Sequence, residues 1–195
     1  NMQAGFVITC VGDERAYSFL PSRKGNTLSD QVSKHVLKWN TKNYKKYTWL
    51  DRGSDERQYC WPGIDLPVTS VMRSKYGVYP EYHTSLDKLG DVVTQKGLAE
   101  SYSLYQKIIL SLEKNYKYVS NTLCEPFLSK RDLYSNISIK NNNINSKTIL
   151  DILSYCDGKH SILDISDLLN MPSEIIYQNI ENLIKLKLIK KKYLR

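Results

Sequence analysis

The sequence predicts an α/β fold in which a mostly parallel sheet is layered with helices, followed by a small winged helix-turn-helix domain. Three observations support this prediction. Buried-strand patterns alternate with amphipathic-helix patterns over residues 1–118. An Asn-rich polar stretch then interrupts both patterns. Three short helix patterns and a β-like end follow, which is the element order of a winged helix.

The first domain opens on residues 5–12 (GFVITCVG), a continuous apolar run typical of a buried parallel strand. Because whole domains seldom begin on a central strand, we expect this domain to be the C-terminal portion of a larger one. An amphipathic helix is expected from Thr27 to about Asn40, where Thr27 and Asp30 approximate a capping box. Two further strands and a long helix complete the domain, over residues 47–50, 66–73 and 94–115.

The second half changes character after residue 118. Residues 119–146 are expected to hold a strand pair, whose sequence begins at Tyr118 and ends at Phe127, and an Asn-rich linker. The winged helix-turn-helix domain is expected over 147–195. Its three helices are predicted over residues 147–156, 164–169 and 173–185, with the β-like LKLIKKKYL at the end.

Composition excludes several classes of protein. The 195 residues contain no signal peptide and no apolar run of membrane-spanning length, which indicates a protein without a membrane partner. Four cysteines lie far apart without a CxxC pair, as in a reduced cytoplasmic protein, and they disfavour a cysteine zinc site. We therefore expect a cytoplasmic protein.

The formal charge of +8 raises the question of nucleic-acid binding. Residues 144–195 hold eight basic and six acidic side chains, and the remaining excess is scattered over the rest of the chain. The third predicted helix of the winged domain displays Glu174 and Glu181, which would repel phosphates. The sequence therefore disfavours nucleic acid and favours a protein partner or a homo-oligomer contact through the winged helix.

Residues 52–88 carry the most specific pattern: a Gly-Ser-Asp turn, a buried strand, and the tripeptide Tyr82-His83-Thr84. This order resembles the last third of the two-zinc exopeptidases, the zinc-dependent aminopeptidases and glutamate carboxypeptidases. A closer resemblance is to a bacterial subfamily of aminopeptidase-like proteins that end in a winged-helix domain. The blocks that carry it are CVGDERAYSFLPSRKGNTLSD, YTWLDRGSDERQYC, LPVTSVMRSKYGVYPEYHTSLD and CEPFLSKRDLY.

The resemblance implies roles for individual residues. Asp13 and His83 match two ligands of one zinc ion, and the complete protein would hold one or two such ions. Tyr82 matches a tyrosine that donates a hydrogen bond to the tetrahedral intermediate, and Asp55 matches a residue that supports the site from behind. Independently of the resemblance, Arg73 could bind a substrate carboxylate. Each residue also has a structural interpretation: Asp13 could cap a turn or pair with Arg15, and His83 could be a structural hydrogen-bonding group.

This chain departs from the two-zinc pattern in one respect. In the family resembled, the second His, the bridging Asp, the ligand Glu and the general-base Glu all precede the strand that corresponds to residues 5–12, so the resemblance assigns none of them to this chain. Two ligands do not close a catalytic zinc site, which takes three protein ligands and a water. The expected function is therefore that of a zinc-dependent aminopeptidase- or carboxypeptidase-like hydrolase, inactive alone, which cleaves a peptide or amide bond by metal-activated water when complete. The alternatives are a non-catalytic peptidase-fold scaffold that binds a partner and, with less support, a DNA-binding regulator.

Overall fold

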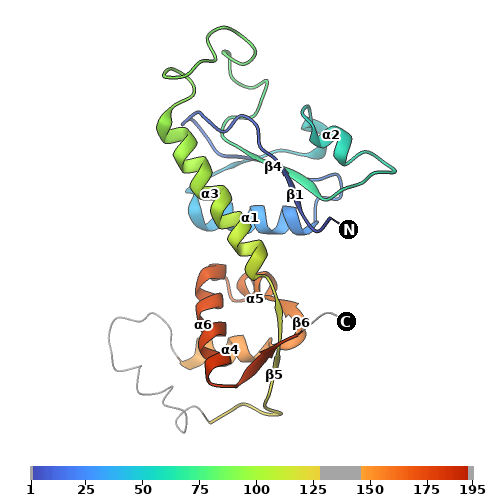
Figure 1. Ribbon diagram of the computed structural model, residues 1–195, viewed down its shortest axis with the longest axis vertical. Coiled ribbons are helices and arrows are strands. Elements are labelled where there is room, and N and C mark those ends of the chain that lie inside the picture. The colour runs from blue at the N-terminus through green and yellow to red at the C-terminus, as the bar shows by residue number, and fades with distance from the viewer. Residues whose placement is uncertain (1, 128–145, 193–195) are drawn as a thin grey trace. The chain divides into compact units, whose positions relative to one another are not determined.

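The computed structural model describes residues 2–127 and 146–192. The chain forms two compact units, Asn1–Leu110 and Ser111–Arg195 (Figure 1). Each unit has its own sheet and its own buried apolar side chains, and each is described here by itself. The predicted fold class, an α/β sheet with helices followed by a winged helix, is confirmed.

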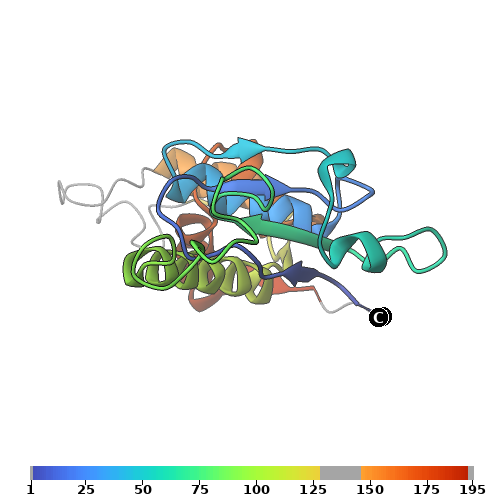
Figure 2. The ribbon, with the colours of Figure 1, turned by 90° about the horizontal axis from the view of Figure 1, so that it is seen from above.

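The sheet of the first unit has four strands in the order β1-β4-β2-β3. Figure 2 shows them side by side in this order, from the dark blue β1 to the cyan β3. Pairs β1–β4 and β2–β3 are parallel, and β2 runs antiparallel to β4. The strands are β1 (Gly5–Val7), β2 (Ser18–Leu20), β3 (Lys45–Lys46) and β4 (Val68–Met72). Because β1 and β4 are parallel, the segments that follow them leave the sheet at the same edge.

Two strand predictions need correction. The first strand ends at Val7 rather than at Gly12, and Cys10 has a left-handed φ of 48°, which a continuing strand does not accommodate. The strand predicted over 47–50 is wrong: the paired residues are Lys45–Lys46, and Trp49–Asp51 forms a 3₁₀ turn. Asp51 causes this turn, because its carboxylate accepts hydrogen bonds from both the backbone and the hydroxyl of Thr48.

Three helices belong wholly or partly to the first unit: α1 (Leu28–Asn40), α2 (Glu56–Tyr59) and α3 (Gln95–Lys114). The capping box predicted for α1 is confirmed, since the Asp30 carboxylate accepts hydrogen bonds from the Thr27 backbone and hydroxyl. Helix α1 buries one face, including Val32, Val36 and Leu37. Helix α3 reaches the sheet through the buried Tyr105, whose hydroxyl donates to the Val71 carbonyl at 2.7 Å.

The second unit contains helices α4 (Ser146–Ser154), α5 (Ile162–Leu168) and α6 (Ser173–Lys185), packed on a three-stranded sheet of order β6-β5-β7. Its strands are β5 (Lys117–Ser120), β6 (Asp157–Ser161) and β7 (Ile189–Lys191). One apolar core joins the helices and the sheet, and Ile152, Ile176, Ile180 and Leu188 are its fully buried members.

The strand pair expected in Tyr118–Phe127 does not form. Only β5 is a strand there, and it pairs antiparallel with β6 and with β7, while residues 121–127 are irregular. The reason is long-range pairing, because β5 lies before α4 in sequence yet occupies the centre of the sheet. Residues Asp157 and Gly158 begin β6. The Asn-rich linker lies outside the described residues.

Candidate functional site

Asp13 lies at the edge of the sheet where β1 and β4 end. It follows β1, and Ser74 follows β4. The Asp13 carboxylate is 4% exposed and accepts three hydrogen bonds: from the Ser74 backbone at 2.8 Å, the Ser74 hydroxyl at 2.8 Å and the Arg15 backbone at 2.9 Å. Two of these bonds end on Oδ1 and one on Oδ2, so Oδ2 keeps a lone pair for another partner. Asp13 caps a turn by accepting the hydrogen bond from the Arg15 backbone, which agrees with its structural interpretation. Its hydrogen bonds from Ser74 also connect the residues after β4 to the segment after β1.

His83 is exposed and has a left-handed φ of 58°. This conformation costs a non-glycine residue about 1–2 kcal/mol, so the surrounding loop has to hold it in place. The imidazole stacks on the ring of Tyr82 with centroids 4.0 Å apart and planes 17° apart. Among the described residues no hydrogen bond to its ring nitrogens is found. The His83 side chain is thus oriented by stacking, with both nitrogens open to a ligand.

Tyr82 is part of a cluster of tyrosines. Its ring lies 6.4 Å from that of Tyr76 and 5.6 Å from that of Tyr79, measured between centroids. Burial raises the pKa of the Tyr82 phenol, and nearby Cys10 and Asp87 act in the same direction. A phenol is protonated at neutral pH even at its ordinary pKa, so Tyr82 carries a proton for donation, which the oxyanion role would need.

An ion pair connects the segment of Asp13 to the segment of His83. The Arg15 guanidinium donates two parallel hydrogen bonds to the Glu81 carboxylate, both 2.8 Å long. The backbone nitrogen of Arg15 binds Asp13, and Glu81 lies two residues before His83. The structure thus links the segments of both predicted zinc ligands at one edge of the sheet.

A second set of contacts holds the Asp13 segment against the start of α3. The Gly12 carbonyl accepts a hydrogen bond from the Thr94 backbone at 2.9 Å, and Glu14 accepts one from the Thr94 hydroxyl at 2.6 Å. Gly97 in the first turn of α3 lies so close that a Cβ there would be 2.0 Å from the Gly12 carbonyl oxygen. Gly97 therefore allows backbone-to-backbone packing immediately beside Asp13.

Asp55 and its neighbour Glu56 differ from the sequence-based expectation. Asp55 is exposed and makes no side-chain capping bond, whereas Glu56 is fully buried. Glu56 Oε1 accepts hydrogen bonds from the Tyr76 hydroxyl at 2.6 Å and from the backbone of Gly53 and Ser54 at 2.8 and 3.0 Å. Its Oε2 has no partner within the described part of the chain. The carboxylate that supports the tyrosine cluster is thus Glu56.

The pKa of Glu56 reflects two opposing effects. Desolvation by burial raises it, but the hydrogen bonds from Tyr76, Ser54 and Gly53 together outweigh burial, so the net pKa is lowered. Burial raises the pKa of the Tyr76 phenol, and its hydrogen bond to Glu56 raises this pKa further. The sequence does not single out Glu56, because an acidic residue in the first helical turn after a Gly-Ser-Asp turn is common at helix starts.

Arg73 already has a carboxylate partner within the protein. Its guanidinium is 3% exposed, lies 3.9 Å from the ring centroid of Tyr17, and donates to Glu100 at 3.0 Å. The neighbouring cation Lys75 is also buried, with its ammonium over the rings of Tyr47 and Tyr76. Substrate binding by Arg73 stays a prediction, and it would require the Glu100 contact to be exchanged.

The described residues contain no group of three or more His, Cys, Asp or Glu side chains able to hold a metal ion. Across residues 2–127 and 146–192, no helix has both the length and the apolar character needed to cross a membrane.

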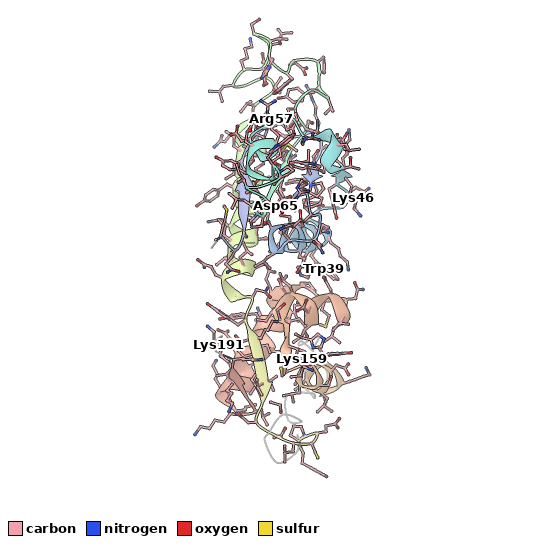
Figure 3. The ribbon with its side chains drawn as sticks, turned by 90° about the vertical axis from the view of Figure 1, so that its right-hand side faces the viewer. Trp39, Lys46, Arg57, Asp65, Lys159 and Lys191 are labelled. Atoms are coloured by element: carbon pink, nitrogen blue, oxygen red, sulfur yellow. The ribbon has the colours of Figure 1, made fainter. Side chains whose placement is uncertain are left out.

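The winged-helix unit carries charged side chains both on its third helix and on its sheet. On α6, the side chains of Glu174, Gln178, Glu181 and Asn182 are exposed. Basic side chains lie on the sheet, including Lys159 on β6 and Lys191 on β7, both labelled in Figure 3, and α6 carries Lys185 in its last turn. A carboxylate-bearing face on the third helix is a poor surface for a phosphate backbone.

Comparisons with known proteins also divide the chain into two parts. Residues 1–115 match the family described as a domain of unknown function (DUF4910), and residues 116–191 match a winged helix-turn-helix family. A relative from Clostridium acetobutylicum is named "Putative polysaccharide biosynthesis protein with aminopeptidase-like domain". It is 36% identical over 192 residues, which cover 97% of this chain and 44% of the relative.

A solved structure is similar to almost the whole of this chain. The crystal structure of a "putative peptidase" from Clostridium acetobutylicum superposes with a TM-score of 0.86 at 34% identity, covering 98% of this chain and 42% of that one. The chain thus spans less than half the length of either match. It has a peptidase-like fold, and over its first 115 residues it belongs to the DUF4910 family of domains of unknown function.

Proposed function

We propose that this chain supplies part of the active site of a zinc-dependent hydrolase of the aminopeptidase or carboxypeptidase type. Asp13 and His83 would bind one zinc ion, and the substrate would be a peptide or another small amide. The observation that carries the proposal is the link from Asp13 through Arg15 to Glu81, which connects the segments of both ligands.

The donor atoms suit zinc. Carboxylate oxygen and imidazole nitrogen are both zinc ligands, and two-zinc hydrolases combine them. Asp13 Oδ2 accepts a single hydrogen bond, and the His83 ring is exposed, so each side chain has an electron pair to give. The hydrogen bonds from Ser74 and Arg15 would orient the Asp13 carboxylate, as outer hydrogen bonds do for ligands of other metal sites.

The chain's own residues would contribute in different ways. Zinc, when bound, supplies polarisation of a carbonyl and a lowered pKa of a water molecule. Tyr82 would donate its phenolic proton in a hydrogen bond to the developing oxyanion, because a phenol is protonated at neutral pH. Its stacking on His83 would fix the distance between the oxyanion donor and the metal ligand.

The further ligands and the base would come from outside these residues. A catalytic zinc site takes three protein ligands, and this proposal assigns two of them, Asp13 and His83, to the described residues. Because the named relative is more than twice as long as the part that this chain matches, activity belongs to a longer protein in this proposal. The 195 residues alone are expected to bind zinc weakly and to hydrolyse nothing.

The cellular setting and the partners are part of the same proposal. All four cysteines are free thiols, as is usual for proteins of the reducing cytoplasm, where we propose that this protein functions. The winged helix is proposed to contact a protein partner or a second copy of the chain, since its α6 face carries Glu174 and Glu181. Nucleic acid is disfavoured for the same reason.

The experiment that tests the proposal measures zinc in the longest native form of the protein. Wild type, Asp13→Ala and His83→Ala are compared by metal analysis after dialysis, with His160→Ala as a control that removes an imidazole from the second unit. We expect one to two equivalents of zinc in wild type and in the control, and loss of at least one in both site variants. Full zinc and full hydrolysis in His83→Ala would refute the assignment. If wild type holds no zinc after reconstitution, a non-catalytic peptidase-fold scaffold becomes the better account.

A further inference from the structure

We propose that Arg15 is a positioning residue that sets the orientation of His83 relative to Asp13. It would do so through Glu81, and neither Arg15 nor Glu81 would touch metal or substrate. This inference rests on the proposed function, because it concerns the same metal site.

The argument starts from the turn that carries His83. The Glu81 carbonyl accepts hydrogen bonds from the backbone and the hydroxyl of Thr84, at 3.0 and 2.7 Å, so residues 81–84 form a turn. His83 occupies its third position with a φ of 58°, while Tyr82 before it does not have a positive φ. This is the sign pattern of a type II turn, in which the third position usually takes glycine. The imidazole therefore projects from a strained turn that begins at Glu81.

Arg15 holds that turn by its first residue. Its guanidinium forms two parallel bonds to the Glu81 carboxylate, a geometry that fixes angle as well as distance. Its backbone nitrogen donates to Asp13 Oδ1. One residue thus contacts one proposed ligand directly and the turn of the other through a rigid pair, across 66 positions of sequence.

The Arg15–Glu81 pair lies at the protein surface. The side chains of Arg15 and Glu81 are 46% and 22% exposed, and the guanidinium carbon also lies 5.8 Å from the ring centroid of Tyr79. Both side chains are charged at neutral pH, as arginine and glutamate ordinarily are. Exposed ion pairs contribute little to stability. The effect of this pair should therefore appear in metal binding far more than in unfolding.

The same loop offers a matched control. Lys88 and Asp91 form an ion pair at 3.0 Å with side chains 61% and 62% exposed, and both residues lie in the loop itself. Lys88→Gln removes a loop ion pair without touching the Asp13 segment. It separates a general effect of loop charge from the specific link to Asp13.

The experiment measures zinc affinity in the longest native form, by competition with a chelator. The variants are Arg15→Gln, Glu81→Gln, their double mutant, Arg15→Lys and the charge reversal Arg15→Glu with Glu81→Arg. We expect each single neutral variant to weaken zinc binding about tenfold or more, as loss of an outer hydrogen bond does at other metal sites. The double mutant should lose no more than either single mutant, because both remove one pair.

Further readouts separate positioning from stability. Arg15→Lys should lie between wild type and Arg15→Gln, because an ammonium does not make the two-pronged contact. The charge reversal should regain most of the affinity. Lys88→Gln should stay within about twofold of wild type. In the zinc-free 195-residue chain, Arg15→Gln should shift the ring proton resonances of His83, and Lys88→Gln should not.

The outcomes distinguish the two proposals. Zinc bound by wild type and lost in His83→Ala, with unchanged affinity in Arg15→Gln and Glu81→Gln, would overturn the role of Arg15 and leave the metal site intact. No zinc in wild type would overturn both. If Arg15→Gln does not fold, Glu81→Gln removes the same pair from the other side and decides the question.

Discussion

Gly97 provides the sharpest test of how the Asp13 segment is held. Replacing it with alanine would place a Cβ 2.0 Å from the Gly12 carbonyl oxygen, 2.6 Å from the Gly12 carbonyl carbon and 2.8 Å from the Asp13 carbonyl oxygen. All three are backbone atoms, so no side-chain rotation relieves the clash. Helix α3 and the segment that carries Asp13 would have to separate by about 1 Å to reach an acceptable contact.

The size of the effect follows from the bonds that such a separation breaks. The Thr94 backbone donates to Gly12 at 2.9 Å, and the Ser101 hydroxyl donates to the Val11 carbonyl at 2.7 Å. Each is worth about 1 kcal/mol, and overpacking adds about 1–3 kcal/mol. The helix gains up to about 1 kcal/mol when alanine replaces glycine. We therefore expect Gly97→Ala to lower the free energy of unfolding by about 2–4 kcal/mol.

Urea denaturation followed by tryptophan fluorescence measures this change in the first unit, because Trp39, Trp49 and Trp61 all lie there. Ser103→Ala, at an exposed position of the same helix, is the control and should be neutral or slightly stabilising. If Gly97→Ala proves as stable as wild type, the close packing beside Asp13 is not as described.

Two more predictions concern buried hydrogen bonds and use the same assay. Glu56→Gln should cost about 1.5–3 kcal/mol at neutral pH, because the carboxylate is fully buried and accepts from the Tyr76 hydroxyl. Because the folded pKa of Glu56 is lowered, its stabilisation is complete above the unfolded pKa of about 4.3 and is lost as the pH falls through the folded pKa. Unfolding between pH 3 and 7 should therefore be less pH-dependent in Glu56→Gln, and an unchanged pH profile would contradict this. Tyr105→Phe removes the bond to the buried Val71 carbonyl and should cost about 1–2 kcal/mol; a neutral result would mean that water replaces the hydroxyl.

Features encoded locally could be predicted from the sequence. Helix α1 follows from its apolar stripe and from Thr27 and Asp30, which lie three residues apart and cap it. The helices of the winged unit follow from apolar periodicity in the same way. Asp13 and His83 are predicted as ligands from the sequence blocks that contain them. The structure links the segments that carry them through Arg15 and Glu81, and their metal-binding role stays a prediction.

Features that depend on distant partners could not be predicted. Strand β5 pairs with β6 and β7, which come after it by some 40 and 70 residues, so no local pattern separates it from a hairpin. The Arg15–Glu81 pair spans 66 positions, and either residue alone reads as a solvated charge. The sequence does not single out Glu56 from the adjacent Asp55, because its buried partner Tyr76 lies twenty residues further on.

The central claim is that Asp13 and His83 bind one zinc ion within a longer peptidase-fold protein. Zinc analysis of the longest native form, beside its His83→Ala variant and the 195-residue chain, tests it most directly. The account predicts one to two equivalents in the wild-type long form, at least one fewer in the variant, and little or none in the short chain. Absence of zinc from the long form after reconstitution, or full occupancy without His83, would contradict it.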